Sequence, residues 1–172
     1  MNRREELVAL FPGADTTFPY ALVPGVEVPA PYHDLLVHEH HMTVTVEQYH
    51  DSPVDVRVLE WRQDGSYYAR KILLALRSTG QVVQFGIVRI DLDQTSPEVR
   101  AALLARQTPV GRILIQHDVL RRIEPTGFVR IDAGPAQMAW FDEVGTGTLY
   151  GRLAIIHCDG RPAVELLEVV RR

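Results

Sequence analysis

Three consecutive stretches of the chain have the composition of β-strands and are separated by short turns. They span residues 54–62, 67–77 and 81–91, and they are rich in valine, isoleucine, leucine and aromatic residues. Gln-Asp-Gly-Ser at 63–66 joins the first two stretches and Ser-Thr-Gly at 78–80 joins the last two, and both joints are typical of hairpin turns. Parallel neighbours would need much longer crossover connections, so the three stretches predict an antiparallel meander.

The rest of the chain adds short helices and further strands. Ser96, Pro97 and Glu98 form a helix start, with a capping residue, a proline at the first helical position and an acid in the first turn. The other expected helices cover 2–11, 43–51 and 108–117, the other expected strands cover 118–123, 127–132, 149–157 and 161–170, and an irregular proline-rich arm covers 12–34. Antiparallel strands with interspersed helices predict an α+β fold, in which helices pack on a single twisted antiparallel sheet.

Length, charge and cysteine content limit the classes of protein that this chain can represent. Its 172 residues fit one domain spanning 1–172, in which an N-terminal helix and the proline-rich arm occupy 1–40. The formal net charge of -4 leaves no basic surface for nucleic acid. No stretch approaches the roughly 20 apolar residues of a membrane span, and the lone Cys158 excludes an internal disulfide. We expect a cytoplasmic protein that binds neither nucleic acid nor membranes, with Cys158 as an inert core thiol.

Arg70 is the residue of the meander that most needs a partner. Strand alternation places it on the face that carries Tyr68 and Ile72, whereas Tyr67 and Lys71 lie on a more polar face. An arginine that points inward among apolar groups requires an anion. That anion can be a ligand carboxylate, a protein carboxylate in an internal salt bridge, or none at all if this end of the strand is open to solvent. The pattern alone leaves these alternatives open.

Two glutamates on the last predicted strand lie on opposite faces. Glu165 alternates with Ala163 and Leu167, and Glu168 alternates with Leu166, so each face carries one carboxylate among apolar residues. A glutamate that faces a pocket can act as an acid or a base, whereas one at the surface or at a sheet edge is only a solvated charge. Periodicity does not say which face points inward.

Two helix starts and a histidine-rich stretch complete the set of candidate features. The backbone N–H groups at Met42-Thr43 and at 108–111 are free to bind an anion, although ordinary capping is the commoner role of such groups. His38-Glu39-His40-His41 contains metal-ligand residue types, but no second cluster accompanies it. We interpret this stretch as a polar approach to a helix and expect no metal ion.

Four short segments match one known enzyme family in their order and separations. They are His-Met-Thr with Val-Glu-Gln within 41–48, Tyr-Ala-Arg-Lys-Ile-Leu-Leu at 68–74, Thr-Pro-Val-Gly-Arg-Ile-Leu at 108–114, and Gly-Arg-Pro-Ala-Val-Glu-Leu at 160–166. The last is two residues shorter in spacing than the family's Gly-Lys-Pro-x-x-x-x-Glu-Leu. From about residue 40 to the C-terminus, the chain therefore resembles the chorismate lyase (chorismate pyruvate-lyase) family, and most closely its actinobacterial and archaeal branch.

The resemblance implies a fold, a reaction and a set of site residues. Family members enclose an aromatic acid in a cavity between an antiparallel sheet and helical flaps. By this resemblance Arg70 grips the ring carboxylate, the backbone amides of Met42 and Val110 assist it, and Glu165 meets the ring hydroxyl and assists proton transfer. The implied reaction is a cofactor-free elimination that converts chorismate to 4-hydroxybenzoate and pyruvate. We expect an enzyme of this carbon-oxygen lyase class, acting as a monomer.

Three other functions remain open at this point. The chain can be a repurposed family member that acts on another carboxylic acid or biosynthetic intermediate. It can instead be a non-catalytic domain that binds an aromatic-acid effector, because effector domains of some bacterial transcription regulators share this fold. The residues ahead of the matching region are proline-rich and not basic, unlike a DNA-binding segment. An unrelated structural domain is the remaining alternative.

Overall fold

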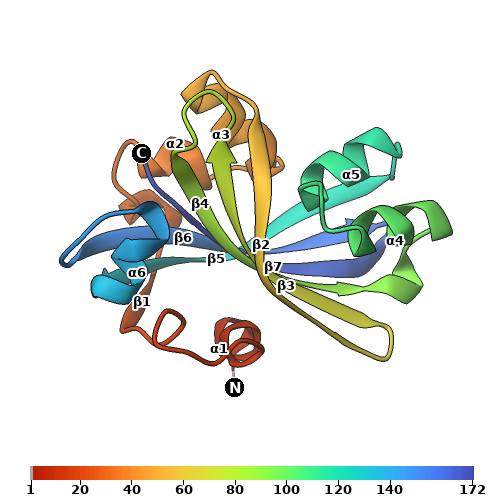
Figure 1. Cartoon of the computed structure of the whole chain (residues 1–172), viewed down its shortest axis with the longest axis horizontal. Coiled ribbons are helices and arrows are strands. Elements are labelled where there is room, and N and C mark those ends of the chain that lie inside the picture. The colour runs from red at the N-terminus through yellow and green to blue at the C-terminus, as the bar shows by residue number, and fades with distance from the viewer. Residues whose placement is uncertain (1) are drawn as a thin grey trace.

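A single antiparallel sheet of seven strands forms the centre of the computed structural model, which describes residues 2–172 (Figure 1). Met1, part of the expected domain 1–172, lies outside the described residues. The strand order across the sheet is β1-β5-β6-β7-β4-β3-β2. The strands are β1 (Tyr20–Val23), β2 (Val54–Asp64), β3 (Tyr67–Leu76), β4 (Val82–Asp91), β5 (Arg121–Ala133), β6 (Gly147–Cys158) and β7 (Arg161–Val170). The α+β fold class predicted from the strand pattern is confirmed.

The predicted meander and the predicted final hairpin are both present. Strands β2, β3 and β4 pair in sequence order, and β6 pairs with β7 across the turn at Asp159 and Gly160. Strand β7 also pairs with β4, so the last strand of the chain lies in the middle of the sheet. Its position joins the meander and the β5–β6 strands into one continuous layer.

The structure corrects the strand predictions in two places. Residues 118–123 and 127–132, predicted as two strands, fall largely within the single strand β5, whose register shifts between Pro125 and Gly127. Proline donates no backbone hydrogen bond, but a local irregularity lets the pairing with β6 resume beyond it. Strand β1 lies inside the arm that was predicted to be irregular, and it is a four-residue edge strand paired with β5.

Four helices cover one face of the sheet as two pairs (Figure 1). They are α2 (Tyr32–Leu36), α3 (Met42–His50), α4 (Pro97–Leu104) and α5 (Val110–Gln116), with the 3-10 turns η1 (Gly25–Glu27) and η2 (Leu92–Gln94). Leu36 of α2 and Met42 of α3 pack on one half of this face, and Leu103 of α4 and Ile113 of α5 pack on the other half. The side chain of Ser96 caps α4, as predicted. Within residues 2–172, no helix has the length and apolar character needed to cross a membrane.

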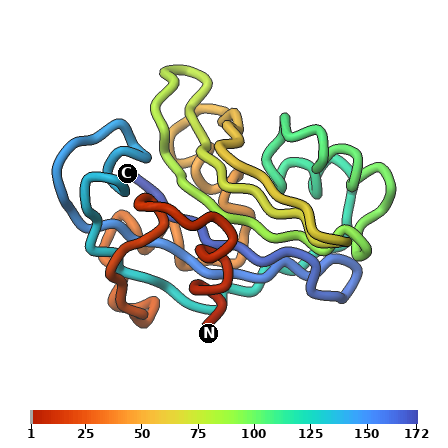
Figure 2. Tube along the Cα trace, turned by 60° about the horizontal axis from the view of Figure 1, so that its bottom comes forward, coloured from red at the N-terminus to blue at the C-terminus, as the bar shows by residue number. Residues whose placement is uncertain are grey.

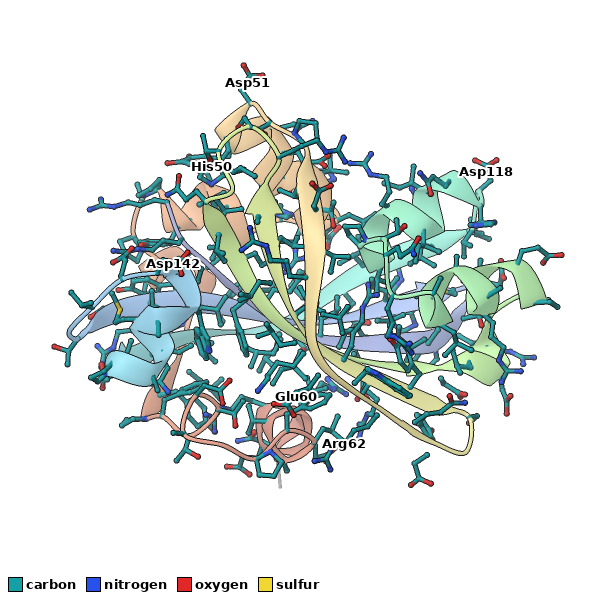
Figure 3. All side chains as sticks on the ribbon, in the orientation of Figure 1. His50, Asp51, Glu60, Arg62, Asp118 and Asp142 are labelled. Carbon is teal, nitrogen blue, oxygen red and sulfur yellow. The ribbon has the colours of Figure 1, made fainter. Side chains whose placement is uncertain are left out.

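The N-terminal segment and two short helical turns cover the opposite face (Figure 2). The helix α1 (Arg3–Ala9), the residues after it, α6 (Pro135–Met138) and η3 (Ala139–Phe141) enclose an apolar cluster with the sheet. There, Trp140 stacks on Phe85 with ring centroids 3.8 Å apart. The sequence predicts a polar face here because it carries Lys71. In the structure Lys71 is buried, and its charge is paired with Asp15 and Glu60 at 2.9 and 2.8 Å. Figure 3 shows Glu60 beside the N-terminal segment.

Gly151 provides a test of how tightly the central strands pack. A Cβ atom at Gly151 would lie 2.8 Å from the backbone oxygen of Glu168, which cannot move without disturbing the β6–β7 pairing. The substitution Gly151→Ala should therefore lower the free energy of unfolding by about 1–3 kcal/mol, measured by urea denaturation. Gly127→Ala is the matched control, because the nearest atoms to its new Cβ lie at 3.8 Å. A Gly151→Ala variant as stable as the wild type would contradict this account of the packing.

Candidate functional site

A cavity lies between the sheet and the first turns of α3 and α5. Its apolar walls come from the sheet and from the helices, and its polar groups come from four strands and from the start of α3. The apolar and backbone lining is formed by Met42, Val56, Ile72, Leu74, Gly86, Ile87, Val88, Pro109, Val110, Gly111, Ile123, Ile156, Leu166 and Leu167. The polar side chains of the lining are His41, Thr43, Arg70, Gln84, Arg152 and Glu168. An apolar enclosure with a few polar groups is the usual form of a small-molecule site.

Arg70 is buried in the wall of this cavity without an anionic partner. Its residue exposure is 1%, and its Nη2 donates a hydrogen bond to the carbonyl oxygen of Thr108 at 2.9 Å. Its Nε and Nη1 atoms are buried and make no hydrogen bond, and no carboxylate of residues 2–172 forms a salt bridge with it. Burial lowers the pKa of Arg70, as expected for a cation removed from water, and the neighbouring hydroxyl of Tyr68 offsets this lowering only in part. Two of the alternatives that the sequence left open for Arg70 are therefore wrong for the described residues. Arg70 forms no internal salt bridge, and its end of the strand is not open to solvent.

The starts of α3 and α5 lie against the same cavity. Met42 and Val110 are the first residues of the two helices and both line the cavity with Arg70, so the structure brings these three sequence-predicted residues together. Neither helix has a side-chain hydrogen bond at its N-cap. Figure 3 shows Asp51 and Asp118, which follow the C-terminal ends of these helices, at the periphery of the molecule. The N-terminal ends therefore point inward, with backbone N–H groups of their first turns not capped by side chains.

Glu165 does not lie with these residues. It is on the opposite face of β7, where it forms ion pairs with Arg89 and with Arg3, the latter at 3.2 Å. The reason is strand alternation, because Leu166 and Glu168 line the cavity from β7 and Glu165 must then point to the other side. The position expected for Glu165 from the resemblance is therefore corrected, and the carboxylate at the cavity wall is Glu168.

Glu168 forms a buried ion pair with Arg152, a residue that the sequence analysis missed. Oε2 of Glu168 accepts hydrogen bonds from Nη2 and Nε of Arg152 at 2.7 and 3.0 Å. Arg152 also donates to the backbone carbonyls of His38 and His40 at 3.0 and 3.3 Å, so its guanidinium is well satisfied. The alternation of β6 carries a signal for Arg152, because that residue shares a face with Ala154 and Ile156.

The histidine stretch borders the cavity through its last residue, His41. His38 donates from Nε2 to the carbonyl of Leu35 at 2.8 Å, and Nε2 of His41 accepts from Nε of Arg121 at 2.7 Å. Burial, with Arg152 near His38 and Arg121 near His41, lowers the pKa of each ring to about 4. Both rings are therefore neutral at neutral pH. Within residues 2–172, no three histidine, cysteine or acidic side chains are grouped in a way that could hold a metal ion.

Comparisons with known proteins give structural relatives only. No protein-family model and no curated protein matches the chain. The structure is similar to PhnF from Mycobacterium smegmatis, with a TM-score of 0.59 and 8% identity over 78% of this chain and 65% of that one. It is also similar to the ligand-binding domain of a protein described as a GntR-family transcriptional regulator from Bordetella bronchiseptica, with a TM-score of 0.51 and 14% identity over 69% of this chain and 85% of that one.

A third structural relative is YydK from Bacillus subtilis, described as a transcriptional regulator. It has a TM-score of 0.50 and 10% identity over 70% of this chain and 58% of that one. The chain thus spans less than two thirds of YydK and of PhnF but most of the isolated ligand-binding domain. These likenesses establish the fold, which is that of GntR-family ligand-binding domains and agrees with the chorismate lyase-like fold expected from the sequence.

The two buried arginines should respond in opposite ways to the same substitution. Arg70→Met removes a buried charge that has no carboxylate partner, so the melting temperature should stay the same or rise. Arg152→Met leaves Glu168 buried without its cation and should cost about 3–5 kcal/mol of unfolding free energy. Thermal and urea denaturation of both variants in the same buffer measure the difference. An Arg70→Met variant that loses as much stability as Arg152→Met would contradict the assignment of Arg70 as unpaired.

The lowered pKa of His41 makes the stability depend on pH in a defined window. The pKa falls from 6.5 to about 4 on folding, so between these values the unfolded chain binds more protons than the folded chain. The free energy of unfolding should therefore decrease as the pH falls from about 6.5 to about 4. In His41→Gln the slope of stability against pH should be shallower in this window. His117→Gln, at an exposed histidine, is the control. Equal slopes for wild type and His41→Gln would refute the effect.

Proposed function

We propose that the chain binds a small carboxylic acid in the cavity beneath α3 and α5, with the carboxylate on Arg70. The observation that carries the proposal is the buried guanidinium with two unbonded nitrogens and no carboxylate of residues 2–172 beside it. A buried cation without an anion is costly, and a ligand carboxylate provides the missing charge together with charge-assisted hydrogen bonds.

The rest of the cavity supports an acid with an apolar body. Aliphatic side chains of β3, β4, β6 and β7 form the wall next to Arg70, and they suit a ring or a short hydrocarbon skeleton. The inward-pointing first turns of α3 and α5 add partial positive charge on the same side as the arginine. The likeness to a ligand-binding domain of a protein described as a GntR-family regulator agrees with a small-molecule ligand.

The second candidate function is catalysis of chorismate cleavage, which the four matching segments favour. In that reaction the ether bond to the enolpyruvyl group breaks and a ring proton leaves, the ring becomes aromatic, and the released enol takes up a proton to give pyruvate. Aromatisation drives the reaction, so the protein has to orient the substrate and manage protons. Arg70 would hold the ring carboxylate, and Glu168 rather than Glu165 would be the carboxylate that assists proton transfer, because Glu168 lines the cavity.

Binding of simple aromatic acids to wild type and Arg70→Met tests the proposal. Isothermal titration calorimetry with benzoate and 4-hydroxybenzoate should show an affinity loss of about 100-fold or more in Arg70→Met, because a buried charge loses its partner. Arg77→Met is the matched control, since Arg77 is an exposed arginine just beyond the end of β3. Equal binding by wild type and Arg70→Met, or no binding by the wild type, would overturn the proposal.

Incubation with chorismate separates the two candidate functions. Pyruvate and 4-hydroxybenzoate are followed together, without added metal or nucleotide. Equimolar formation of both products, lost in Arg70→Met, would establish the lyase. Binding of 4-hydroxybenzoate without turnover would favour a ligand-binding domain.

A further inference from the structure

Gln84 is a buried polar side chain of the cavity wall that has no hydrogen-bond partner. It lies on β4 with a residue exposure of 4%, and its Oε1 atom is fully buried and unbonded. No hydrogen bond of its amide nitrogen is found either within the part of the chain that the structure describes. A buried amide left unpaired is costly, and most such groups in folded proteins are satisfied.

Gln84 and Arg70 lie toward opposite ends of the cavity. Arg70 pairs across the sheet with Val88, which is four residues from Gln84 along β4 and on the same face. The spacings along and between strands place the Cα atoms of Arg70 and Gln84 about 14 Å apart. Ile72, Gly86 and Val88 line the wall between them, so the cavity has an apolar middle with one unsatisfied polar group toward each end.

Glu168 and Arg152, the charged residues of the wall near Gln84, are paired with each other. Glu168 pairs across the sheet with Gly86, two residues from Gln84, and its Oε2 is held by Arg152. Arg152 in turn donates to Glu168 and to backbone carbonyls of the histidine stretch. The amide of Gln84, by contrast, makes no hydrogen bond within the described residues.

We infer that Gln84 determines specificity, selecting a carboxylic acid that carries a hydroxyl or carboxamide group at the end remote from the carboxylate. This inference rests on the proposed function, because it takes the ligand carboxylate to lie on Arg70. An amide donates and accepts at the same time, so the matching ligand group must do both. A methyl or halogen in that place would leave the amide unpaired, and a site built to hydrogen-bond a ligand group rejects analogues that lack it.

The experiment compares a series of benzoates that differ only at the position opposite the carboxylate. The probes are 4-hydroxybenzoate, 4-carbamoylbenzoate and 4-methylbenzoate, with benzoate as reference, titrated by calorimetry into wild type and Gln84→Met. The methyl and hydroxyl groups have similar sizes, so the change in their affinity ratio between wild type and Gln84→Met reports the contribution of the amide. The wild type should prefer the hydroxyl or the carbamoyl compound over the methyl compound by about 10-fold or more. In Gln84→Met this preference should disappear or reverse, while benzoate affinity stays within about threefold of the wild type.

Gln137→Met is the matched control for removing a buried amide. Gln137 lies on the other side of the sheet, where its amide donates to the carbonyls of Ala14 and Asp15 at 2.9 and 3.1 Å. Its replacement should lower the melting temperature and leave the ligand preference unchanged. Gln84→Met should keep the melting temperature of the wild type or raise it, because no hydrogen bond within the described chain is lost.

The outcomes separate this inference from the proposed function. If the benzoates bind through Arg70 and Gln84→Met keeps the wild-type preference, the inference fails alone, and the hydroxyl is recognised by another group such as Glu168. If the wild type shows no preference among the probes, the inference also fails alone. If no probe binds, or if Arg70→Met binds them all as well as the wild type does, the proposed function and the inference fail together.

Discussion

The buried ion pair between Arg152 and Glu168 connects the sheet to the segment that leads into α3. Its two residues lie opposite each other on β6 and β7, and the arginine also holds backbone carbonyls of the histidine stretch. One guanidinium thus fixes the distance between the sheet and the start of α3, where His41 and Met42 border the cavity. The shape of the cavity therefore depends on an interaction made in its own wall.

Arg70 differs from Arg152 in that the protein supplies no carboxylate for its guanidinium. Both arginines are almost fully buried, but Arg152 is surrounded by acceptors, whereas Arg70 donates to one carbonyl and has only the hydroxyl of Tyr68 beside it. Groups left unsatisfied in an otherwise well-paired interior are expected where a ligand completes the site. Gln84, on the same wall, fits this description for the same reason. The distinguishing feature of the cavity is thus the unpaired hydrogen-bonding atoms of Arg70 and Gln84 in its wall.

The sequence predicted the sheet better than it predicted the site. Short turns and alternation were enough for the meander, for the final hairpin and for the inward direction of Arg70, because these depend on local geometry. Alternation also showed that Glu165 and Glu168 lie on opposite faces, but it could not say which face borders the cavity. The choice of Glu165 came from aligning a motif whose spacing differs by two residues from the family pattern. In the structure Glu165 lies outside the cavity, and Glu168 lines it instead.

The central position of β7 has a consequence for how the chain folds. The meander of β2, β3 and β4 is built from neighbours in sequence and can form early, whereas β7 pairs with β4 only after about 70 further residues have been made. Until then the inner edge of β4 is an unpaired strand edge flanked by apolar side chains, which is a site where partly folded chains aggregate. The same late pairing places Glu168 of β7 opposite Gly86 of β4, so the wall of the cavity is completed only when the β6–β7 hairpin joins the meander, and ligand-binding competence becomes a reporter of complete folding.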